Sequence, residues 1–226
     1  MSNKKIIRLA VVLVILAVAG TTTLVSEFGG TNGTAILDPG AAPADAVETL
    51  EGLEVSGSGS MAGYSREKFP HWSDAREYGW DVSNTSCDAR DAALIRDGEE
   101  VVVEDGCDVV TGVWLDPFTA QTFTDPSDID VDHVVPLANA WRSGADSWDA
   151  AERERYANDP DVLLSVEDNA NQSKGDKGPE AWKPPNEAEW CDYAKQWTSI
   201  KAKYELSVNE QEKQALLQML GSREGG

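Results

Sequence analysis

The segment DIDVDHVVPLANAW, residues 128–141, constrains the fold more than any other part of the chain. Apolar and polar side chains alternate over Ile129–Val135, which predicts a half-buried strand, and Pro136 ends it. Asp132 and His133 are adjacent in this strand, so their side chains point to opposite faces unless the backbone bends. The strand therefore needs a partner strand, and it carries a carboxylate next to an imidazole.

A second strand and a helix are predicted later in the chain, where that partner is needed. Val162–Val166 is a short apolar run, and the residues after it favour a helix with Asp168 or Asn169 as its N-cap. This helix would carry Asn171 and would break near Gly175 or shortly after it. The succession of strand, strand and helix predicts an α+β fold.

The remaining elements extend this core on both sides. Periodicity and turn residues predict a helix over 88–96, strands over 101–103, 109–115 and 118–123, and helices over 137–142, 149–156, 187–204 and 208–220. We therefore predict a central hairpin and helix, extended by an N-terminal β-hairpin and by C-terminal helices. The aromatic residues of the last two helices are assigned to the core and not to a surface on which bases stack.

The N-terminus has the pattern of an export signal. Lys4, Lys5 and Arg8 precede an apolar run over Leu9–Val25, and Ala17–Ala19 offers the small residues that a signal peptidase needs. The run is intermediate in length between a signal-peptide core and a short membrane span. A cleaved peptide and a retained membrane anchor both fit it, and cleavage is favoured. In either case the rest of the chain is expected outside the cytoplasm.

Composition divides the chain into an N-terminal extension and one folded domain. Residues 1–25 are the signal peptide or anchor, and residues 26–63 are rich in Gly, Ala, Ser, Pro and acidic side chains, which predicts a flexible linker. The folded domain is predicted over 64–221, where aromatic residues become frequent. Residues 222–226 form a short tail.

Three cysteines fit a compartment in which disulfides persist. Cys87 and Cys107 are the natural pair, and closing their loop of about 20 residues would stabilise the fold by about 3 kcal/mol. Cys191 is then left over. It is either a buried free thiol or half of an intermolecular bridge.

The net charge of −21 limits the partners that the chain can bind by charge alone. A field of this sign repels nucleic acid, which counts against a simple electrostatic DNA-binding protein. Basic residues are more concentrated in the second half of the chain, so a local basic face is compatible with the sequence. Adaptation to a salty habitat explains the acidity equally well.

Phosphodiester hydrolysis needs the residue types that the strand and the helix bring together. A base must deprotonate water, which suits a histidine, and a cation must neutralise charge on the phosphate and on the leaving oxygen. Asp132 can point at a metal while His133 points at a water, and the amide oxygen of Asn171 can reach the same metal. Lys174 and Lys177 follow at distances that would let them meet phosphate oxygens.

Several short motifs, taken together, resemble one known family. DHVVPL, residues 132–137, with NQSKGD, residues 171–176, is similar to HNH endonucleases, including the variants in CRISPR effector nucleases and in the C-terminal domain of GmrSD-type restriction enzymes. The sequence is also similar to small secreted actinobacterial-type HNH proteins. Their pattern covers residues 64–220 here, and its other motifs are Cys87–Arg90, Gly112–Pro117 and Trp197–Tyr204.

The resemblance implies a ββα-metal (HNH) nuclease core and gives each motif residue a role. Asp132 would ligate the metal, His133 would be the general base, and Asn171 would be the second metal-site residue. Arg90 is a further candidate for contact with a substrate phosphate. The sequence departs from the family pattern in two places, since the third position of the HNH motif is not a histidine and a second C-terminal cysteine opposite Cys191 is missing.

The expected metal follows from the small number of histidines. The chain has 2 of them, His71 and His133, which disfavours a multi-histidine Zn²⁺ site. A site made of Asp132, Asn171, water and phosphate oxygens suits Mg²⁺ or Mn²⁺. His71 belongs to no motif and is assigned a structural role.

The predicted activity is metal-dependent hydrolysis of nucleic acid, DNA more than RNA, without a small-molecule cofactor and with low sequence specificity. Structural interpretations stand beside these assignments: a capping role for Asp132 and Asn171, solvated charges for Lys174 and Lys177, and a buried ion pair for Arg90. For the whole chain, the alternative is a non-catalytic, surface-tethered interaction module. A glycosidase lacks a motif here, and a zinc peptidase lacks HExxH.

Overall fold

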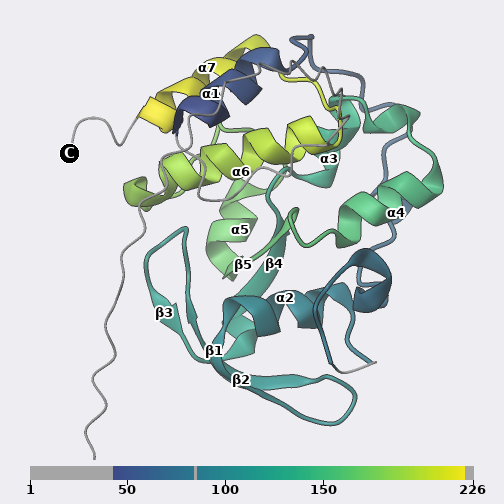
Figure 1. The fold of residues 1–226 in the computed structure, drawn as a ribbon, viewed down its shortest axis with the longest axis vertical. Helices are drawn as coiled ribbons and strands as arrows, with labels where there is room; N and C mark the ends of the chain where they lie inside the picture. Colours follow the sequence, from purple (N-terminus) through teal and green to yellow (C-terminus); the bar gives the residue numbers. More distant parts are fainter. Residues whose placement is uncertain (1–42, 84–85, 222–226) are drawn as a thin grey trace, which may run out of the picture. The chain divides into compact units, whose positions relative to one another are not determined.

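The computed structural model describes residues 43–83 and 86–221. They form a mixed α+β domain, as the sequence predicts (Figure 1). The predicted export signal over 1–25, the first part of the predicted linker and the tail over 222–226 lie outside the described residues. Within 43–83 and 86–221, no helix is both long enough and apolar enough to cross a membrane.

The order of helices and strands follows the predicted order closely. The helices are α1 Pro43–Gly52, α2 Ala89–Asp97, α3 Leu137–Arg142, α4 Ala150–Asn158, α5 Asp168–Lys174, α6 Trp190–Lys203 and α7 Glu210–Leu220. The strands are β1 Glu99–Val103, β2 Val109–Leu115, β3 Thr122–Phe123, β4 Ile129–His133 and β5 Leu163–Glu167. Short 3₁₀ turns connect several of them, among them η1 Arg66–Lys68 and η3 Pro126–Asp128.

Two small antiparallel sheets account for all the strands that the described residues contain. One has the order β1-β2-β3, and the other is the ribbon of β4 and β5. Trp114 of β2 is 2% exposed and donates from its indole Nε1 to the carbonyl of Leu94 on α2 at 3.0 Å. Gly112 makes room for this ring, because a Cβ there would lie 2.6 Å from it. The first sheet is thereby fixed to α2.

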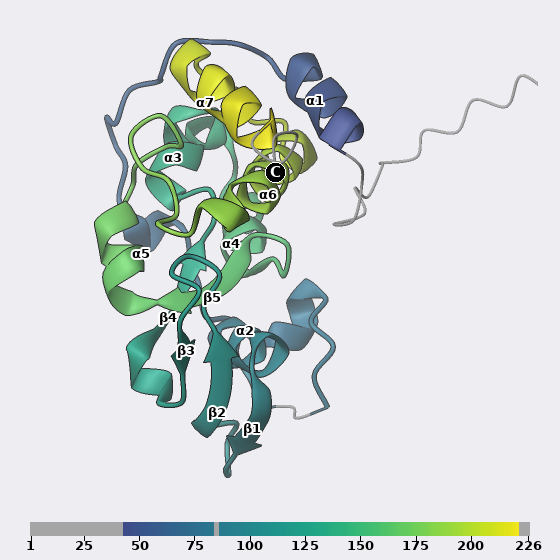
Figure 2. The ribbon, with the colours of Figure 1, turned by 90° about the vertical axis from the view of Figure 1, so that its left-hand side faces the viewer.

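The ribbon of β4 and β5 lies between two clusters of buried residues. On one side α2 and the first sheet bury Trp114, Leu94, Ile129, Val131 and Leu163. On the other side the helices bury a larger set that includes Val134, Val166, Tyr193, Trp197 and Leu216. Figures 1 and 2 show α1, α6 and α7 together at one end of the described domain and the first sheet at the other. Of the aromatic residues assigned to the core, Tyr193, Trp197 and Tyr204 are buried, and Trp190 is partly buried against it.

Part of the predicted flexible linker over 26–63 is instead a helix. α1 has Ala46 and Leu50 on one face, 6% and 0% exposed, and this face packs on α6 and α7. Val55 then forms a parallel β-bridge with Val208, and the amide of Ser56 donates to the Val208 carbonyl at 2.9 Å. The segment is rich in small and acidic residues, but its few apolar side chains recur at helical spacing, and burial of that face fixes the helix.

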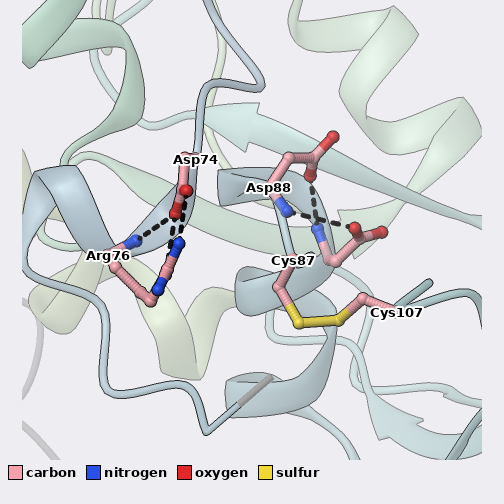
Figure 3. Close-up of a disulfide and its surroundings, with 6 residues drawn as sticks. Asp74, Arg76, Cys87, Asp88 and Cys107 are labelled. Carbon is pink, nitrogen blue, oxygen red and sulfur yellow. Dashed lines mark hydrogen bonds and ion pairs between the residues drawn. A yellow bond between two sulfur atoms is a disulfide. The ribbon is translucent and has the colours of Figure 1, made fainter. Parts of the chain in front are cut away.

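Cys87 and Cys107 form the disulfide that the sequence predicts (Figure 3). It joins the residue before the N-cap of α2 to the turn between β1 and β2. Asp88 caps α2, and its carboxylate accepts from the amide of Asp91 at 2.9 Å. Cys191 is a buried free thiol, so of the two alternatives for this residue the structure has the first.

Candidate active site

Asp132 and His133 end strand β4, and Asn171 lies on α5, which follows β5 directly. In the ribbon Asp132 is opposite Leu164 and His133 is opposite Leu163. The turn from β5 into α5 is tight, since the helix begins at the residue after the strand. Glu167, and not Asp168 or Asn169, is the N-cap, and its carboxylate accepts from the amide of Ala170 at 2.6 Å.

Two polar contacts connect β4 to α5. The amide nitrogen of Asn171 donates to Asp130 Oδ2 at 3.1 Å, and the ammonium of Lys174 donates to Asp132 Oδ1 at 2.9 Å. Residues two apart on a strand share a face, and residues three apart on a helix share a face. Asp130 therefore contacts Asn171, and Asp132 contacts Lys174, side by side between β4 and α5. We call each of these two contacts a rung.

The rung between Lys174 and Asp132 is a buried ion pair. Their side chains are 0% and 6% exposed, and Lys174 Nζ lies 2.8 Å from Asp132 Oδ2 and 3.0 Å from the carbonyl of His133. Burial raises the pKa of Asp132 and lowers that of Lys174, and the attraction between the two charges opposes both effects. Asp132 Oδ2 is buried, and its 2.8 Å contact with the ammonium lacks hydrogen-bond geometry.

The imidazole of His133 is held in one orientation. Its Nε2 lies 3.0 Å from the carbonyl of Ala157, at the end of α4. A carbonyl can only accept, so Nε2 carries the hydrogen and the neutral ring keeps its lone pair on Nδ1. Trp72 stacks on the ring with centroids 6.0 Å apart, and burial lowers the pKa of His133 to about 3. The ring is therefore neutral at physiological pH.

Asp132, His133 and Asn171 line one pocket of about 270 Å³. Leu137 and Ala138 of α3 form part of its wall, and the other lining residues are Tyr64, Arg66, Val131, Pro136, Gly175 and Asp176. The structure thus brings together all three residues that were predicted as the core of the site. Asp132 and His133 come from β4 and Asn171 from α5, and Asn171 follows His133 by 38 residues in the sequence.

The three predicted phosphate-contacting residues are not in this pocket. Lys174 is fully buried beneath it in the ion pair, so the predicted contact between its ammonium and a substrate phosphate does not fit the structure. Lys177 is exposed but donates to the carbonyl of Ser173, and Arg90 is half-buried 3.5 Å from the carbonyl of Ile129. Neither of these two side chains lines the pocket.

Asp116, in the turn after β2, positions the start of α5. This residue is 1% exposed, and its carboxylate accepts from the amide of Glu167 at 3.0 Å and from the amide of Thr119 at 2.7 Å. In the sequence, Asp116 is recognisable only as part of the family motif Gly112–Pro117. Its contact with Glu167 could not be predicted from the sequence, because the two residues are 51 positions apart.

Asn158, at the end of α4, positions the turn that covers His133. It is 0% exposed, accepts from the amide of Ser73 at 2.9 Å and donates to the carbonyl of Pro70 at 2.9 Å. Since Ala157 binds His133, two neighbouring residues of α4 hold the imidazole and the turn that carries Trp72.

Three residues at the site were not predicted from the sequence: Tyr64 and Arg66, which line the pocket, and Asp130, which accepts from Asn171 beside it. The spacing of Asp130 and Asp132 against Asn171 and Lys174 was a usable signal, because a strand and a helix can match two such pairs. For Tyr64 and Arg66 the chain gives no local signal, since neither belongs to a chemical motif.

The fold and the pocket define an α+β domain that presents polar side chains from a β-ribbon and a short helix. The chain belongs to the family of the GmrSD restriction endonuclease C-terminal domain, which its sequence matches over residues 88–219. This membership associates the chain with nucleases. An uncharacterized secreted protein of Arthroderma benhamiae is 47% identical over 175 residues, which are 76% of this chain and 82% of that protein. No solved structure matches the chain.

Proposed function

We propose that the chain is a metal-dependent endonuclease of the HNH type that hydrolyses phosphodiester bonds outside the cytoplasm. The observation that carries this proposal is the convergence of Asp132, His133 and Asn171 on one pocket. Family membership supports a nuclease, and the description of the Arthroderma benhamiae relative as secreted supports export. DNA is proposed as the substrate ahead of RNA, with low sequence specificity.

His133 is proposed as the general base. Its Nε2 is engaged by the carbonyl of Ala157, which leaves Nδ1 to accept a proton from water. The lowered pKa keeps the ring neutral, and the negative charge of a bound phosphate would raise its affinity for the proton. The water attacks phosphorus as His133 takes its proton, and the P–O3′ bond breaks. The leaving 3′-oxygen takes a proton from solvent water, so the products carry a 5′-phosphate and a 3′-hydroxyl.

The pocket fits a hard divalent cation such as Mg²⁺ or Mn²⁺. Asp132 Oδ2 contacts the Lys174 ammonium without hydrogen-bond geometry, and Asn171 donates to Asp130 through its nitrogen, so the Asn171 amide oxygen is the atom left for a ligand. Carboxylate and amide oxygens suit these ions. The described residues hold no cluster of three or more His, Cys, Asp or Glu suited to a metal, so water and substrate phosphate would complete the ligand set. When bound, the ion would stabilise charge on the phosphate and the leaving oxygen.

The test is cleavage of plasmid DNA by the full chain with Mg²⁺, with Mn²⁺ and with EDTA, next to His133→Ala. We expect nicking that requires metal, and a loss of at least about 100-fold in the variant because its base is gone. Equal thermal unfolding temperatures would show that both proteins are folded. Substantial cleavage by His133→Ala would reject His133 as the base. No cleavage of DNA or RNA by folded wild type would favour an interaction module.

A further inference from the structure

Arg66 lines the candidate pocket and forms no ion pair with any of the described residues. Its side chain is exposed and lines the pocket. The guanidinium makes neither a hydrogen bond nor an ion pair with any residue in the described ranges. The nearby cations differ, because Lys174 is buried against Asp132 and Arg142 pairs with Asp176 at 2.9 Å.

The chain has 40 acidic and 19 basic side chains, so a carboxylate partner would be expected for each arginine. The charge of Arg66 opposes the rise in the pKa of Asp132 and adds to the fall in the pKa of His133, so its electric field reaches both residues. The turn that carries Arg66 is held in place by a backbone hydrogen bond and by a side chain buried in the core. The amide of Phe69 donates to the Arg66 carbonyl at 3.0 Å, and the Phe69 ring is 0% exposed in the core.

We propose that Arg66 binds a backbone phosphate of the nucleic acid beside His133. A guanidinium matches phosphate with two parallel hydrogen bonds, and a free one does not have to break an ion pair first. The inference rests on the proposed function for its substrate class. It places a substrate-binding residue in the segment before residue 88, outside the part of the chain that matches the family. Contact with phosphate alone carries no sequence information.

The test measures binding of a fluorescently labelled single-stranded oligonucleotide to the full chain by anisotropy, with His133→Ala as the background so that cleavage cannot interfere. Arg66→Gln should weaken binding by roughly 10- to 100-fold at low salt, the usual effect of losing a hydrogen-bonded charge. The slope of log K against log salt should fall in magnitude by about 0.7, which corresponds to one phosphate contact.

Lys68→Gln is the matched control, because Lys68 is on the same turn, is also exposed and lies over the Trp141 ring, 5.0 Å from its centroid, without lining the pocket. It removes the same charge, so it should change affinity by less than about twofold if the contact is local. Arg66→Lys keeps the charge and loses the two parallel bonds, so its affinity should lie between Arg66→Gln and the parent.

Equal affinity and equal salt slope for Arg66→Gln and Lys68→Gln would overturn the inference. If wild type cleaves nucleic acid and these two variants bind alike, only the role of Arg66 fails. If Arg66→Gln alone weakens binding while wild type cleaves nothing, the binding site stands and the proposed nuclease activity fails.

Discussion

The domain has two buried lysine–carboxylate pairs, and they differ in how completely they are hydrogen-bonded. Lys201 of α6 and Glu212 of α7 are 0% and 2% exposed and 2.6 Å apart. Lys174 and Asp132 are 0% and 6% exposed and 2.8 Å apart. By burial and distance alone the two pairs are nearly equal.

The helical pair has a partner for every polar group. Lys201 also donates to the Ser143 hydroxyl at 2.9 Å and to the Ser207 carbonyl at 2.8 Å, and Glu212 accepts from the Trp197 indole at 2.7 Å. In the second pair Asp132 Oδ2 lies 2.8 Å from the ammonium without hydrogen-bond geometry, and Asp132 lines a pocket. Fully hydrogen-bonded polar groups stabilise a fold, whereas a carboxylate with incomplete hydrogen bonding beside a pocket keeps capacity to bind a ligand.

Breaking the helical pair should have the largest effect on stability. Lys201→Met leaves the Glu212 carboxylate buried without its cation, so we expect a loss of about 3–5 kcal/mol in the free energy of unfolding. Urea denaturation measures it. Lys195→Met, on the same helix but in the partly exposed pair with Asp192, should lose less than about 1 kcal/mol. Similar values for the two variants would show that the Lys201–Glu212 pair is not structural.

Acid should destabilise the pocket region through His133. Burial lowers the pKa of this ring from 6.5 to about 3 in the folded protein. The stability that the neutral ring contributes is complete above the unfolded value and is lost as pH falls from 6.5 toward 3. At about pH 4.5 the loss is about 2–3 kcal/mol. His133→Gln lacks this titration, so its unfolding free energy should fall less between neutral pH and that value. Parallel pH profiles for the two proteins would contradict this.

Breaking the Lys174–Asp132 pair should cost less than breaking the helical pair, and a cation should restore part of the loss. Lys174→Met is expected to lose about 1–3 kcal/mol, because Asp132 borders a pocket from which water can reach it. Mg²⁺ at 100 times its dissociation constant would return about 2.7 kcal/mol. Thermal unfolding with and without Mg²⁺ measures this directly. Equal Mg²⁺ responses in Lys174→Met and Lys201→Met would remove the distinction between the two pairs.

The rung between Asp130 and Asn171 should affect cation binding more than stability. Asp130→Ala removes the acceptor that orients the Asn171 amide, so the affinity for Mn²⁺ should fall about 10- to 100-fold while stability changes by less than about 1 kcal/mol. Calorimetric titration measures the affinity. Asp128→Ala, an exposed carboxylate in the preceding turn, is the control for charge. An affinity equal to that control would show that Asp130 does not orient the site.

The site was predictable from sequence where the signal is local. Alternation predicted β4, an apolar run predicted β5, and polar residues after it predicted α5. The approach of Asp132 and Asn171 was predicted from the chemistry of a metal site and from the resemblance to HNH endonucleases. The N-cap was misplaced by one or two residues, because Glu167 is both the last residue of β5 and the N-cap of α5. A residue that belongs to a strand and also caps the following helix cannot be recognised when strands and helices are predicted separately.

Long-range contacts account for what sequence analysis could not predict. Lys174 resembles an exposed helix residue until Asp132 and the His133 carbonyl, 42 and 41 residues away, surround its ammonium. Arg66 reaches the pocket only because Phe69 is buried elsewhere. The α1 helix was taken for a linker because its composition is small and acidic, and only the faces of α6 and α7 give Leu50 a place to be buried.

The packing of α1 on α6 and α7 also constrains the order in which the helices of the domain can fold together (Figure 2). The earliest described helix needs the two latest ones, and contacts this far apart in sequence carry the largest loop-closure entropy. During synthesis Leu50 therefore has no core to enter until α7 has been made. The helical half of the domain therefore cannot assemble from its N-terminal end onward, because α1 packs on α6 and α7.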